Sequence, residues 1–184
     1  MWHAPTKWPA QLTLSCGASS RIGTQLAGLE PRGFRWVIQD RLAVCERIGG
    51  HGFQHRRVRR EEEILWLVDK GFNTVLSFLT SNQNQQAYES AGMRFVHVPL
   101  EGEVEDEDLS GILAKFDEAL DPPNAVVLVH RDLIDDTVVG LLGGYLVHGG
   151  LIEDRIVATS VIQEISGRPL GPEGRRLIPE SAKK

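Results

Sequence analysis

Eight consecutive residues in the C-terminal half of the chain combine one histidine, one arginine and three aspartates. They directly follow residues 125–129, the most apolar run of strand length in the chain. In order, the eight residues are His130, Arg131, Asp132, Leu133, Ile134, Asp135, Asp136 and Thr137. A histidine beside carboxylates suits general acid–base chemistry, with His130, Asp132 and Asp136 as candidate catalytic groups. Carboxylates at one strand end also suit Mg²⁺, which would allow metal-assisted hydrolysis of a phosphoester.

The metal alternative is weakened by the spacing of these aspartates. Asp135 and Asp136 are neighbours, so their side chains point in different directions and do not form a ready set of ligands. We therefore expect no metal and no cofactor in this loop. The only cysteines are Cys16 and Cys45, too few for a disulfide framework or a zinc site. This predicts a reducing, cytoplasmic location.

Two charged segments have an ordinary explanation and a functional one. Residues 51–60 contain six basic side chains, namely His51, His55, Arg56, Arg57, Arg59 and Arg60. Residues 101–108 contain six acids, namely Glu101, Glu103, Glu105, Asp106, Glu107 and Asp108. We expect the basic segment to be a solvated loop that pairs with the glutamates following it, and the acids to cap a helix. Alternatively, the basic segment binds an acidic partner, or the two segments pair between copies in a homodimer.

Composition excludes several classes of protein. The chain has 184 residues, with 41% hydrophobic residues, 24% charged residues and a net charge of −5. These values describe one folded globular domain, and the negative charge argues against a general nucleic-acid binder. No segment approaches the roughly 20 apolar residues that span a bilayer, so no membrane association is expected.

The positions of strands and helices predict how the loop is held. Strand-like runs occupy residues 34–39, 42–45, 73–79, 94–98 and 125–129, with a shorter one at 11–15. Helical patterns occupy residues 61–70, 83–91, 109–120, 138–147 and 152–165, with a short one at 172–177. Alternating strands and helices favour an α/β fold with a mostly parallel central sheet that carries helices on both faces. We predict an irregular arm over residues 1–33, a single domain over 34–178 and a tail over 179–184.

Ligands of such sheets bind at the carboxyl ends of the strands, which is where residues 130–137 lie. Several segments of the chain have a familiar order. They are WVI at 36–38, LA at 42–43, TVL at 74–76, GMRFVHVPL at 92–100, VVLVH at 126–130, YLV at 145–147 and GRP at 167–169. Together they resemble the dual-specificity branch of the cysteine-dependent protein tyrosine phosphatases. The resemblance spans residues 34–178, is strongest over 92–150, and implies the phosphatase fold.

The resemblance also shows what the loop lacks. In that family the strand ends in His-Cys, and an Arg-Thr follows after five residues; the thiolate attacks phosphorus, and the helix N-terminus and the arginine hold the phosphate. Here His130 matches, but Arg131 replaces the cysteine, Ile134 replaces the loop glycine and Thr137 replaces the arginine. The family's general acid has no aligned counterpart, because Gly102 stands at its position.

Glu101 and Glu103 are the nearest equivalents of that acid, each displaced by one residue. The loop itself carries a net charge of −2. At about 4 Å and an effective dielectric constant near 20, each like-charge pair costs on the order of 4 kcal/mol, so the loop sequence predicts repulsion of phosphate. Asp135 or Asp136 is expected to cap the following helix, with the protein's own carboxylate in the place of the substrate.

Three hypotheses follow. The first is a catalytically inactive phosphatase-like protein that uses residues 130–137 as a binding or regulatory loop for a protein or a small acidic or neutral ligand. The second is an enzyme with a repurposed pocket, using His130, Asp132 and Asp136. The third is residual phosphatase activity with Cys16 as nucleophile, since Arg21 follows it at one residue less than the family spacing; a cysteine in a turn is the simpler interpretation. Cys45 lies within a strand-like run and is expected to be buried and unreactive.

Overall fold

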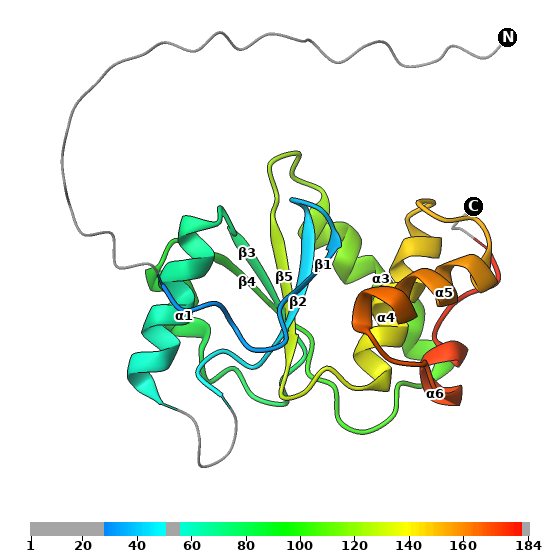
Figure 1. Cartoon of the computed structure of the whole chain (residues 1–184), viewed down its shortest axis with the longest axis horizontal. Helices are drawn as coiled ribbons and strands as arrows, with labels where there is room; N and C mark the ends of the chain where they lie inside the picture. Colours follow the sequence, from blue (N-terminus) through cyan, green and yellow to red (C-terminus); the bar gives the residue numbers. More distant parts are fainter. Residues whose placement is uncertain (1–27, 51–55, 182–184) are drawn as a thin grey trace, which may run out of the picture.

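A computed structural model describes residues 28–50 and 56–181 of the chain, and its centre is a sheet of five strands (Figure 1). The strands are β1 (Arg35–Ile38), β2 (Leu42–Glu46), β3 (Thr74–Ser77), β4 (Arg94–His97) and β5 (Val127–Arg131). Their order across the sheet is β1-β2-β5-β3-β4. Only the edge strand β1 is antiparallel to its neighbour; the other pairings are parallel. The central strand β5 therefore ends at the same edge as β2 and β3.

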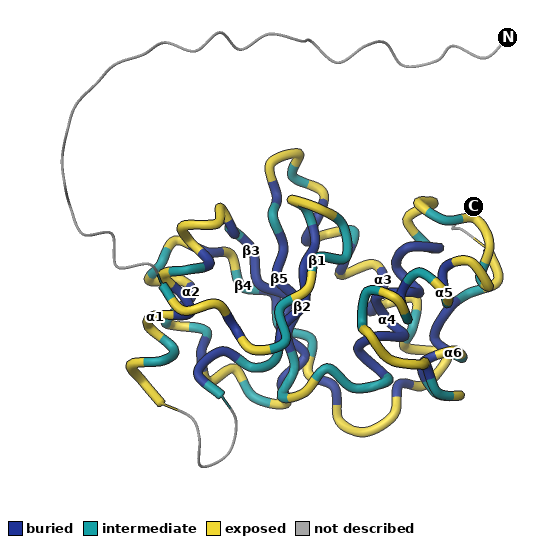
Figure 2. Tube along the Cα trace, in the orientation of Figure 1, coloured by how far each residue is buried: buried dark blue, intermediate teal, exposed yellow. Residues whose placement is uncertain are grey.

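Helices cover both faces of the sheet. They are α1 (Arg57–Asp69), α2 (Gln85–Ser90), α3 (Asp106–Leu120), α4 (Asp136–His148), α5 (Arg155–Ser166) and α6 (Pro172–Arg176). Figure 1 shows α1 on one side of the sheet, with α3, α4, α5 and α6 on the other. Alternate residues of β2 enter different cores: Ala43 and Cys45 pack with α1, whereas Leu42 and Val44 join the larger cluster with α3 and α4. The sheet is thus the middle layer, and its central strands are buried (Figure 2).

The predicted fold class and order of elements are confirmed, with one notable difference in a boundary. Helix α1 begins at Arg57, four residues before the predicted start at 61. The reason is local: Arg57 pairs with Glu61 and Arg59 with Glu63, each one turn later in the helix. Part of the segment taken for a loop is therefore the first turn of α1. The predicted strand at 11–15 and most of the predicted arm lie outside the described residues.

Helix α4 is the most buried helix and carries glycines where its neighbours come closest. A Cβ atom at Gly140 would lie 2.5 Å from the carbonyl oxygen of Gly174 and 2.6 Å from its Cα atom. Gly144 meets the carbonyl of Leu177 in the same way. The glycines of α4 therefore allow α6 to approach its backbone, and α6 is in turn connected to the loop at the start of α4.

This close approach predicts that Gly140→Ala lowers the free energy of unfolding by about 1–3 kcal/mol, because the new methyl group would overlap backbone atoms of α6. Urea unfolding monitored by circular dichroism measures the change. Gly111→Ala in α3 is the matched control, since nothing lies within 4 Å of its would-be Cβ atom. That control should stabilise by about 0.5–1 kcal/mol through helix propensity alone. Equal effects of the two substitutions would contradict the packing argument.

Candidate functional site

The candidate site is the loop that joins β5 to α4. It lies at the carboxyl edge of the sheet, where β2, β5 and β3 end in register: His130 is level with Cys45 of β2 and Ser77 of β3. The loop closes by a hydrogen bond from the backbone N–H of Val138 to Asp135 Oδ1, at 3.0 Å. Asp135 is thus the N-cap of α4, one of the two positions that the sequence offered for this role.

Arg131 lies where the resemblance to the phosphatases places the nucleophilic cysteine, and its guanidinium is bound within the loop. Nη1 forms an ion pair with Asp135 Oδ2 at 2.7 Å, and Nη2 donates to the carbonyl oxygen of Leu100 at 3.3 Å. The arginine side chain is only 16% exposed. Asp135 therefore holds the helix N-terminus with one carboxylate oxygen and Arg131 with the other.

Asp132 binds an arginine that follows the end of a different strand. Its Oδ1 lies 3.2 Å from Nη1 of Arg47, which follows the end of β2, and Arg47 also contacts the side chain of Gln83. The Arg47 side chain is only 13% exposed, so this charge lies mostly within the protein. From the sequence, Arg47 was notable only as the arginine two residues after Cys45. The sequence did place Arg47 just after the carboxyl end of a predicted strand, where ligands of such sheets bind.

Asp136 points away from the other two aspartates, toward the C-terminal part of the chain. Its Oδ1 accepts a hydrogen bond from the backbone N–H of Gly171, and its Oδ2 accepts one from that of Gly174, both at 2.8 Å. Arg168 completes the arrangement at 3.3 Å. Burial alone would raise the pKa of Asp136, but the two N–H groups and Arg168 hold that pKa below its ordinary value. The side chain fastens α6 to the beginning of α4.

The three loop aspartates are therefore each paired with a different arginine. Arg131 belongs to the loop, whereas Arg47 and Arg168 come from segments that precede and follow it in the sequence. The three negative charges of the carboxylates are balanced by the three positive charges of the guanidinium groups. The repulsion predicted from the loop charge of −2 left out two of these arginines, because they are distant in sequence. At this loop, Arg131 and the Val138 N–H at the start of α4 both bind the carboxylate of Asp135.

His130 is fully buried beneath the loop and faces Tyr88 of α2. Its Nε2 lies 3.5 Å from the tyrosine hydroxyl, and its Nδ1 has no hydrogen-bond partner among the described residues. Burial, followed by the charge of Arg47 and the neighbouring His97, lowers the pKa of His130 to about 3. The ring is therefore neutral near pH 7 and is not the imidazolium that would serve as a general acid.

The three candidate catalytic residues do not converge on one point. His130 faces Tyr88, Asp132 binds Arg47, and Asp136 binds the α6 segment. Within residues 28–50 and 56–181, no group of three or more His, Cys, Asp or Glu side chains could hold a metal ion. The geometry thus gives the acid–base and Mg²⁺ alternatives no assembled site.

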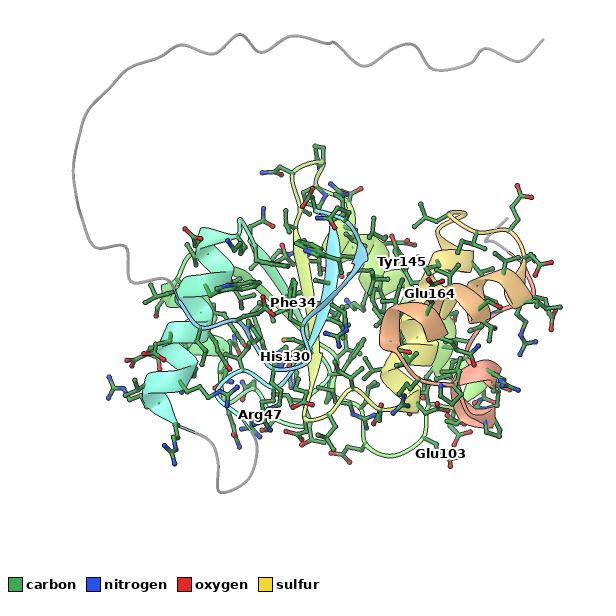
Figure 3. All side chains as sticks on the ribbon, viewed as in Figure 1. Phe34, Arg47, Glu103, His130, Tyr145 and Glu164 are labelled. Atoms are coloured by element: carbon green, nitrogen blue, oxygen red, sulfur yellow. The ribbon has the colours of Figure 1, made fainter. Side chains whose placement is uncertain are left out.

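The two candidate general acids are exposed and line an open hollow of about 310 Å³ with Asp108 of α3. Glu103 lies toward α6 in Figure 3, away from Arg47 and His130. The segment is fixed by Arg176, which contacts Asp106 and the carbonyl of Val104 and also binds Glu173. The acids at 106–108 lie at the start of a helix as expected, but α3 begins at Asp106 and not at 109, so they form its first turn.

The remaining candidates have structural roles or lie outside the described residues. Cys45 is buried in β2, and burial together with Glu63 and Glu46 raises the pKa of its thiol. Glu63, only 1% exposed, accepts hydrogen bonds from the backbone of Gly49 and from Arg59. Two side chains of the basic segment, Arg57 and Arg59, thus pair with the following glutamates as expected. Cys16, His51 and His55 are outside the described residues.

Comparison with known proteins identifies the fold. No family sequence model and no curated protein sequence matches the chain. Among solved structures, it is similar to the core catalytic domain of the PP-IP phosphatase SIW14 from S. cerevisiae, with TM-score 0.59, 14% identity and coverage of 82% of this chain and 86% of that one. The kinase associated phosphatase KAP gives 0.60 and 15%, covering 80% and 92%.

A putative phosphatase from Shewanella putrefaciens CN-32 gives a TM-score of 0.56 and 17% identity, covering 80% of this chain and 89% of that one. Likeness at these identities shows the fold alone. The chain has the fold of the tyrosine and dual-specificity phosphatases, as its element order predicted. No helix in the described part is long and apolar enough to cross a membrane.

The contacts of Asp136 predict that Asp136→Ala lowers the free energy of unfolding at pH 7 by about 1.5–3 kcal/mol, because charged hydrogen bonds to α6 are lost. Its folded pKa is below the unfolded value of about 3.9. The contribution is therefore complete above that pH and disappears as the pH falls through the lower folded value. Urea unfolding between pH 2 and pH 7 measures both effects. Asp132→Ala, which loses one partly exposed ion pair, should cost less than about 1 kcal/mol.

The buried imidazole predicts a second pH effect. The unfolded state protonates this histidine near pH 6.5, whereas the folded state does so only near pH 3. As the pH decreases from about 6.5 to about 3, the free energy of unfolding should fall by at most about 1.4 kcal/mol per pH unit. His130→Gln should remove this contribution to the pH dependence. Ring ¹⁵N chemical shifts provide the direct measurement, and we expect a neutral His130 from pH 8 to pH 4. A ring that titrates near pH 6.5 would contradict the burial argument.

Proposed function

We propose that this protein is a catalytically inactive phosphatase-fold protein, a pseudophosphatase, that acts as a binding or regulatory module. The observation that carries the proposal is the ion pair of Arg131 with Asp135 at 2.7 Å. It occupies the position of the nucleophile with a guanidinium, which cannot attack phosphorus, and it neutralises that guanidinium with the carboxylate that caps α4.

The rest of the loop supports the same proposal. The phosphatases of this fold hold phosphate by the helix N-terminus and by an arginine seven positions after the histidine. Here Asp135 takes the helix N-terminus, and buried Thr137 takes the arginine position. Neither nearby group replaces the missing chemistry: the Cys45 thiol is buried with a raised pKa, and His130 is neutral near pH 7.

A binding role fits a loop whose fold is maintained by its own charge pairs. Each of its aspartates connects it to a different segment, so the loop is held in one conformation without a ligand. We propose a protein or a small ligand as partner, in place of the phosphorylated substrate of an active enzyme. Nucleic acid is disfavoured by the net charge of −5.

The test is hydrolysis of 4-nitrophenyl phosphate and of a phosphotyrosine peptide by the full chain. We expect no turnover above the uncatalysed background, in the wild type and in Cys16→Ser alike. Wild-type turnover above that background would overturn the proposal, and its loss in Cys16→Ser would favour the displaced nucleophile.

A restored variant shows that the assay detects chemistry on this scaffold. It combines Arg131→Cys, Ile134→Gly, Asp135→Ser and Thr137→Arg; the serine keeps a side-chain oxygen at the N-cap of α4. We expect turnover to appear in this variant. A second variant, with Arg131→Ser in place of Arg131→Cys and the other three substitutions kept, should show none.

A further inference from the structure

The loop also borders a cavity, through the side chain of Ile134. Ile134, which replaces the glycine of the active loops, extends toward Gly33, where a Cβ atom would lie 3.0 Å from Ile134 Cδ1. Together with β1, β2, α4 and α5 it encloses a cavity of about 110 Å³. A glycine at position 134 would leave this side of the cavity without its wall.

The interior of the cavity is apolar. Its lining includes the side chains of Val37, Val44, Val139, Leu142, Ile162 and Ile165. Four of these are almost fully buried and belong to the main core, so the walls are fixed in place. An enclosed apolar cavity of about 150 Å³ binds benzene. The smaller volume and branched apolar walls here suit a branched aliphatic group.

Two arginines line the cavity beside the apolar walls. Arg168 is 41% exposed and shares Asp136 with the backbone of α6. Arg35 is exposed, and its one hydrogen bond goes to the backbone carbonyl of Phe34. No carboxylate lies within ion-pair distance of Arg35 in the part of the chain that the structure describes. An uncompensated positive charge thus stands beside an apolar chamber.

We propose that this cavity binds a small monocarboxylate with a branched aliphatic body, either as a free acid or as the C-terminal residue of a peptide. The aliphatic group enters between β1 and α5, and the carboxylate remains at the surface between Arg35 and Arg168. The proposal rests on the binding role proposed above and names a ligand class for it. Two residues of the loop contribute: Ile134 forms a wall, and Asp136 binds Arg168 at the cavity.

A carboxylate at this position would also reach the degenerate loop. It would compete with Asp136 for Arg168, while the two backbone N–H groups of α6 keep their hold on Asp136. Binding therefore loosens one of the three aspartate–arginine pairs and leaves the N-cap of α4 unchanged.

The experiment measures the binding of 4-methylpentanoate to the full chain by isothermal titration calorimetry and by the shift in melting temperature. 4-Methylpentan-1-ol lacks the charge and acetate lacks the aliphatic body, so both should bind at least about fivefold more weakly. N-Acetyl-leucine distinguishes the two sources: tighter binding than 4-methylpentanoate identifies a peptide C-terminus, and weaker binding identifies a free acid.

Variants locate the site independently of any hydrolysis assay. Arg35→Gln should weaken binding about fivefold, whereas Arg32→Gln, on the same segment but outside the cavity, should not. Val37→Phe and Ile165→Phe fill the cavity from opposite walls and should abolish binding while the melting temperature of the free protein is kept.

Absence of binding by both carboxylates, or binding that survives both cavity-filling variants, would overturn the cavity proposal. The hydrolysis assay tests the proposed function separately, because it does not depend on ligand binding in this cavity.

Discussion

The ion pair between Arg131 and Asp135 is the contact on which the rest of the site depends. Asp135 accepts the Val138 N–H in the first turn of α4 and the guanidinium of Arg131 at the same time, so one carboxylate serves both the helix N-terminus and the charge at the end of β5. A helix N-terminus attracts an anion. Here the chain itself supplies one, the carboxylate of Asp135.

The same principle extends outward from this contact. Asp132 ties the loop to the end of β2 through Arg47, and Asp136 ties it to α6 through two backbone N–H groups. Because α6 lies directly on the glycines of α4, the helix that begins at the loop is clamped at its start and along its length. The charged side chains of this loop thus connect the end of β2, the start of α4 and α6.

Much of this was readable in the sequence. Apolar runs of strand length and helical patterns located the strands and helices, and the order of the elements indicated the phosphatase fold. The replaced positions 131, 134 and 137 were equally plain, since each has a fixed distance from His130. The start of α1 was harder to predict from the sequence. A run of arginines suggests a loop unless the glutamates one helical turn later are considered as their partners.

The sequence alone determined which chemical groups the loop contains: no cysteine at its strand end, no clamping arginine, and three carboxylates. Only the tertiary structure decided what those groups do. Arg47 and Arg168 reach the loop from distant segments, so the charge balance and the directions of Asp132 and Asp136 depend on how the chain is folded. Burial, too, is a property of packing, and it is burial that makes His130 a neutral core residue and Cys45 an inert thiol.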